Sequence, residues 1–150
     1  MKKPESICIF GDSTAWGAWD MEKAGWVNRL WIHVGRRVED YVIIYNLSIS
    51  GGTTQTIIDR FENEAQIREA DALIFQSGGN DSYLKGKNGA NQIPLDKFKK
   101  NLEEIIKNTK NRLFIGTFSS QLERMIKIIG CAEKQGRKII IEGRSMKTNV

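Results

Sequence analysis

The sequence lacks the features that mark several classes of protein. Only two of its 150 residues are cysteines and one is a histidine, so no cluster has the spacing of a zinc site. Its apolar runs are four or five residues long, too short to span a membrane, and no apolar segment follows Met1 and the two lysines after it, as one would in a signal peptide. We therefore expect a cytoplasmic chain with no membrane span, no metal and no other cofactor, and with Cys8 and Cys131 as reduced core residues.

Nucleotide-binding and nucleic-acid-binding signals are missing as well. The sequence has neither a G-x-G-x-x-G motif after its first apolar run nor a P-loop lysine motif. The formal net charge of +5 is uneven, because residues 1–116 contain 16 basic and 15 acidic residues whereas residues 117–150 contain seven and three. No aromatic residues interleave with the basic ones of the tail to stack on bases, so we do not expect a nucleic-acid partner.

The length suits one domain, residues 1–150, in which strands and helices alternate. Short apolar runs predict five strands, at Ser6–Phe10, Val42–Leu47, Ala72–Phe75, Arg112–Ile115 and Lys138–Ile141. Apolar residues at helical spacing predict helices over about 26–39, from Thr53 or Thr54 through Phe61, from Pro94 to Ile106, and from Leu122 to a stop at Gly136. This alternation indicates an α/β fold with a parallel five-stranded sheet covered on both faces.

Small and polar residues follow each of the first three predicted strands. Gly11, Asp12 and Ser13 come directly after the first strand, and Gly51 follows the second. The tripeptide is typical of a tight turn, and the glycine suits a helix cap as well as an anion site. Each motif alone is therefore compatible with an ordinary connection.

A third motif, Gly78, Gly79, Asn80 and Asp81, follows the third strand and is also typical of a turn. The carboxyl ends of parallel strands meet at one edge of a sheet, so all three motifs should lie together. Ser13 would then supply a nucleophile, and the Gly51 N–H and the Asn80 amide would supply two donors for an oxyanion. This combination suits acyl transfer.

These motifs, in this order, resemble those of the SGNH/GDSL hydrolase family over residues 5 to about 117. The resemblance implies a flavodoxin-like three-layer α/β/α sandwich and hydrolysis of small-molecule esters or thioesters without a cofactor. It also implies that Ser13 is the nucleophile and that Gly51 and Asn80 are the oxyanion donors. The supporting residues are Gly11, Asp12, Gly78 and Asp81. Thr14 departs from the family, which often has Leu or Ile at this position.

The resemblance also implies a late Asp-x-x-His block, which these 150 residues do not contain. No Asp follows Asp96 and no His follows His33. His33 lies in a predicted helix that runs away from the strand ends, and Lys85 and Lys87 lie in a polar loop, so none of the three is favoured as a base. A serine site without its base keeps only about 10³–10⁴-fold acceleration over water. We therefore expect an impaired hydrolase.

Residues 117–146 show no SGNH motif and resemble a segment of β-CASP metallo-ribonucleases of the RNase J type, at Thr117-Phe-Ser-Ser and Gly143-Arg-Ser-Met. The metal-binding signatures of that family are absent. We hypothesise a chimera, whether natural, engineered or an assembly artefact, in which an SGNH-like part (1–116) is completed by a helix and strand from residues 117–150. Two alternatives to a hydrolase stay open, a non-catalytic α/β domain that binds a small ligand and a folded chimera without activity. The sequence predicts neither the substrate nor the oligomeric state.

Overall fold

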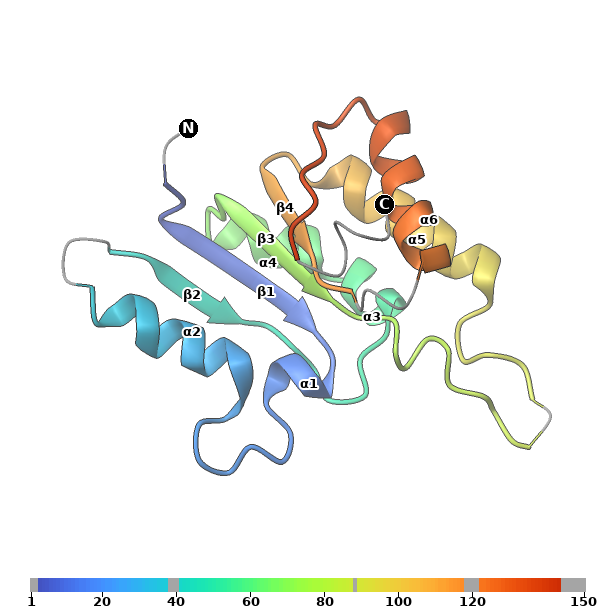
Figure 1. Cartoon of the computed structure of the whole chain (residues 1–150), viewed down its shortest axis with the longest axis horizontal. Helices are drawn as coiled ribbons and strands as arrows, with labels where there is room; N and C mark the ends of the chain where they lie inside the picture. Colours follow the sequence, from blue (N-terminus) through green and yellow to red (C-terminus); the bar gives the residue numbers. More distant parts are fainter. Residues whose placement is uncertain (1–2, 38–40, 88, 118–121, 144–150) are drawn as a thin grey trace.

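A computed structural model describes residues 3–37, 41–87, 89–117 and 122–143. Four parallel strands form one sheet in the order β2-β1-β3-β4 (Figure 1). The strands are β1 (Ser6–Gly11), β2 (Ile43–Asn46), β3 (Ala72–Gln76) and β4 (Arg112–Ile115). The helices are α1 (Ser13–Trp16), α2 (Gly25–Gly35), α3 (Thr54–Ile58), α4 (Phe61–Ile67), α5 (Leu95–Asn108) and α6 (Leu122–Lys134).

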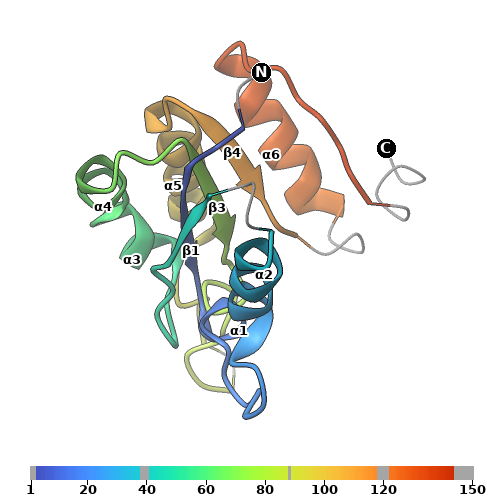
Figure 2. The ribbon, with the colours of Figure 1, turned by 90° about the vertical axis from the view of Figure 1, so that its left-hand side faces the viewer.

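Helices cover both faces of the sheet, as the alternation predicts. On one face, Val27 of α2 and Ala15 of α1 pack against Ile9 of β1. On the other, α3, α4 and α5 cover the face that carries Phe10 and Phe75. Helix α6 packs against α5 near the β4 edge (Figures 1 and 2). None of the helices in the described ranges is both long and apolar enough to cross a membrane.

The prediction of a fifth strand at Lys138–Ile141 is wrong, because these four residues form neither helix nor strand. Arg137 Nη1 donates to the Asn111 carbonyl, 3.2 Å away, so the chain returns to the start of β4. The segment then runs apart from β4 (Figure 2), and Ile140 is 71% exposed. An apolar run forms a strand only when a neighbour accepts its backbone hydrogen bonds, and pairing of this kind is not encoded by composition.

Smaller differences concern helix ends. The helix predicted over 26–39 ends at Gly35, and residues 38–40 lie outside the described ranges. The helix predicted from Thr53 through Phe61 is two helices, because Arg60 leaves the helical conformation with φ −145° and α4 starts after it. The pattern Ser120-Gln121-Leu122-Glu123 predicts a capping box at the start of the last helix, and its first two residues lie outside the described ranges.

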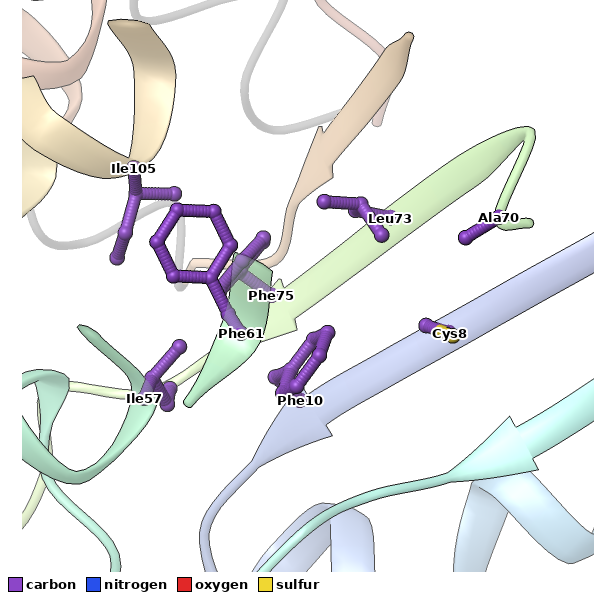
Figure 3. Packing of buried hydrophobic residues seen from close by; sticks show 8 residues of the cluster. All are labelled: Cys8, Phe10, Ile57, Phe61, Ala70, Leu73, Phe75 and Ile105. Atoms are coloured by element: carbon purple, nitrogen blue, oxygen red, sulfur yellow. The ribbon is translucent and has the colours of Figure 1, made fainter. Parts of the chain in front are cut away.

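Three phenylalanines form the centre of the larger core (Figure 3). Phe10 and Phe75 stack with their ring centroids 5.3 Å apart, and Phe61 meets both rings edge-on. Cys8 lies two residues before Phe10 on β1 and belongs to the same core, where burial raises the pKa of its thiol to about 11. Both cysteines are unpaired and buried.

Replacing Phe75 with alanine should destabilise the protein strongly. The ring is 4% exposed and contacts two other rings, so its removal should lower the free energy of unfolding by about 3–5 kcal/mol. Phe114→Ala is the matched control on the neighbouring strand, since that ring is 52% exposed. Urea unfolding of both variants measures the difference, and equal losses would contradict the assignment of the core centre.

Candidate active site

Ser13 lies on the turn where β1 passes into α1. Asp12 is the N-cap of α1, and its carboxylate accepts a hydrogen bond from the Thr14 N–H at 2.9 Å. A Cβ at Gly11 would lie 2.5 Å from the Cβ of Ala15, so only glycine allows so tight a turn. The turn fixes Ser13 as the first residue of α1, half-buried at the carboxyl edge of the sheet.

The loop after β2 is held against this turn by backbone hydrogen bonds. The Ile49 N–H donates to the Gly11 carbonyl at 3.0 Å, and the Gly52 N–H closes a turn onto Ile49. A Cβ at Gly52 would lie only 3.3 Å from the Gly11 oxygen, so the two glycines approach closely. Gly51 has φ +77°, the left-handed region that favours glycine.

The loop after β3 is bonded to the loop after β2. Asn80 Nδ2 donates to the Gly52 carbonyl at 2.9 Å. The Asp81 carboxylate, only 3% exposed, accepts from both the Thr54 N–H and the Thr54 hydroxyl at the start of α3. A Cβ at Gly79 would lie 3.8 Å from Asp12 Oδ2, on the first loop. The structure thus brings together the three motifs that the sequence places after separate strands.

This edge presents several donors that no described group uses. The backbone N–H groups of Ser13 and Gly51 have no acceptor among the described residues. Asn80 Nδ2 carries two hydrogens, of which the bond to Gly52 takes one. Unused donors beside a serine hydroxyl can stabilise the oxyanion of an acyl-transfer intermediate. Sequence reasoning missed the Ser13 N–H, although the first N–H groups of any helix lack an intrahelical partner.

The family comparison agrees with this geometry. The model of the GDSL-like lipase/acylhydrolase family matches residues 9–131. The chain belongs to this family. The match continues past the last GDSL motif in the sequence and into α6, as far as Cys131.

Solved structures show the same fold at low identity. An alpha/beta hydrolase enzyme from the metagenome of Lake Arreo, Spain, is 18% identical with a TM-score of 0.67, covering 96% of this chain and 80% of that chain. A variant of an acetyl xylan esterase from Geobacillus stearothermophilus is 15% identical with a TM-score of 0.68, covering 89% and 74%. The psychrotrophic esterase EstA from Pseudoalteromonas sp. is 19% identical with a TM-score of 0.66, covering 91% and 76%.

Shorter stretches match curated Ribonuclease J proteins. Identity is 45% over 47 residues with the protein from Thermus thermophilus and 28% over 85 residues with that from Mycoplasma genitalium. The chain spans only 8% and 14% of the lengths of these two proteins. Because residues 117–150 number only 34, both stretches begin before residue 117 and overlap the GDSL match. Such local matches do not extend ribonuclease activity to this chain.

Two catalytic mutants of the acetyl xylan esterase replace an aspartate and a histidine that are three positions apart in that protein. No such pair occurs in the 150 residues of this GDSL-family chain. His33 is exposed near the C-terminal end of α2, which points toward the start of β2 and away from Ser13 (Figure 1). Lys85 and Lys87 are exposed in the loop after β3. Within the described ranges, no hydrogen bond or ion pair joins any of these three side chains to Ser13 or to the loops around it.

Proposed function

We propose that this chain is a serine ester hydrolase whose activity is impaired because the Asp-x-x-His block is absent. Ser13 Oγ attacks the ester carbonyl, and the resulting oxyanion accepts hydrogen bonds from the Gly51 N–H and the Asn80 amide. Gly11, Asp12 and Gly78 shape the loops that hold these groups. The substrate class is small-molecule esters or thioesters, in keeping with the family and with the esterases that share the fold.

The observation that carries the proposal is the hydrogen bond from Asn80 to the Gly52 carbonyl. This bond links Asn80, in the loop after β3, to the glycine pair in the loop after β2. Gly52 of that pair in turn packs against Gly11. An oxyanion site works because its donors are fixed before the charge develops, so this cross-linking of three loops is what the chemistry requires.

The activity of the isolated 150 residues should be low. A serine hydroxyl is a weak nucleophile until a base takes its proton, and the Asp-x-x-His block that does so is not in this sequence. Asp81 does not replace it, since both carboxylate oxygens cap α3. The remaining acceleration then comes from oxyanion stabilisation and binding.

Covalent labelling tests the nucleophile directly. An aryl phosphonate should react so that a Ser13 Oγ–P bond forms, the P–O aryl bond breaks, the aryl oxide leaves and the serine proton passes to solvent. Mass spectrometry of the intact chain and of its peptides should find one adduct, on Ser13. Ser13→Ala should remain unlabelled, and Ser82→Ala, in an exposed position after Asn80, should be labelled like the parent. Equal labelling of the parent and Ser13→Ala would overturn the proposal.

A second function is a non-catalytic domain that binds a small ligand at the same edge. A cavity beside the Asn80 loop favours it. Saturable binding of acyl compounds, with no adduct at Ser13, would identify this function instead.

A further inference from the structure

A cavity of about 460 Å³ opens beside the candidate site, between the loop after β3, the start of α5 and α6. Gly78 and Asp81, on either side of Asn80, line it, whereas Ser13 and Gly51 do not. Much of its wall is apolar, from Ile93, Leu95, Phe98 and Leu122. Two cations on one face of α6, Arg124 and Lys127, also line it.

Arg124 is fixed in this wall. Its Nη2 donates to the Gly78 carbonyl at 3.2 Å, and its Cζ lies 5.5 Å from the centre of the Phe98 ring. A Cβ at Gly78 would lie 3.0 Å from that Cζ, so the guanidinium rests on the bare face of this glycine. The pKa of Arg124 lies below its ordinary value because burial lowers it by more than the nearby Asp81 carboxylate raises it.

Among the described residues, most of the hydrogen-bonding capacity of Arg124 is unused. A guanidinium has five N–H donors, and within these residues Arg124 forms one hydrogen bond, to Gly78. Within the described ranges, neither Arg124 nor Lys127 forms an ion pair. The carboxylates in the lining do not supply one, because both Asp81 oxygens bind Thr54 and Glu123 is exposed to solvent. A half-buried cation with free donors and an apolar surround is suited to a bidentate anion.

We propose that this cavity binds a small organic carboxylate, with the anion on Arg124 and Lys127 and the apolar body against Phe98 and Ile93. The inference deepens the proposed function and rests on it for one point. If Ser13 is the nucleophile, the preferred esters carry a carboxylate on the part of the molecule that extends past Asn80 into the cavity.

Binding can be measured without turnover. Calorimetry compares 4-phenylbutyrate with its neutral amide, on the parent chain and on Ser13→Ala. The acid should bind at least about tenfold more tightly than the amide, since a hydrogen bond to a charged group is stronger than a neutral one. Arg124→Met and Lys127→Met should each reduce that preference.

Lys134→Met is the matched control, because it removes the same charge from α6 two turns further on and does not line the cavity. Thermal unfolding of each variant checks that the fold is kept, and Lys127→Met serves if Arg124→Met fails to fold. Equal binding of acid and amide, binding of neither, or an equal loss in Lys134→Met and Lys127→Met would each overturn the carboxylate site. Carboxylate binding without labelling of Ser13 would instead reject the proposed hydrolase and leave this site standing.

Discussion

Added imidazole should accelerate ester hydrolysis by the 150-residue chain, and Ser13→Ala should abolish that acceleration. The chain holds a half-buried serine beside unused donors but no Asp-x-x-His block. A small base that diffuses to the edge of the sheet can take the serine proton while Oγ attacks. General base catalysis contributes about 10²–10⁴-fold, so rescue on the order of 10² is expected at saturating imidazole.

The measurement is release of p-nitrophenolate from a short-chain ester at increasing imidazole concentrations. Imidazole also cleaves such esters in solution, and Ser13→Ala measured in parallel supplies that background. Rescue should follow the neutral form of imidazole and therefore grow as pH rises through its pKa. The same dependence on imidazole in the parent and Ser13→Ala would show that the serine is not the reacting group.

Local sequence patterns predicted the helices, strands and motifs better than the contacts between segments that are distant in the sequence. The three motifs could be placed at one edge because a parallel sheet aligns the carboxyl ends of its strands, and the bond from Asn80 to Gly52 agrees with this placement. Local patterns could not predict whether Lys138–Ile141 forms a strand, because strand formation there depends on pairing with β4.

The same distinction separates residues within one motif. Asn80 and Asp81 are adjacent in sequence, yet Asn80 bonds to Gly52 while Asp81 caps α3 through Thr54. In the sequence, Arg124 is one of seven basic residues in 117–150, and no motif distinguishes it from the others. Its contact with Gly78, 46 positions away, has no local signal, so the cavity that it lines could be found only from the structure.

Asn80→Ala should lower the rescued rate by about 10²–10³-fold, because removal of one oxyanion donor has an effect of this size. The loss should appear in kcat with little change in KM, since the oxyanion forms only after the ester is bound. Ser82→Ala is the control in the same loop, where an exposed hydroxyl donates to the Gly79 carbonyl. Asn80 also anchors its loop to Gly52, so general loosening is the competing explanation. Loosening would weaken substrate binding and raise KM together with the loss in kcat, whereas loss of a donor to the transition state leaves KM in place. An Asn80→Ala variant that keeps the kcat of the parent would remove this side chain from the oxyanion site.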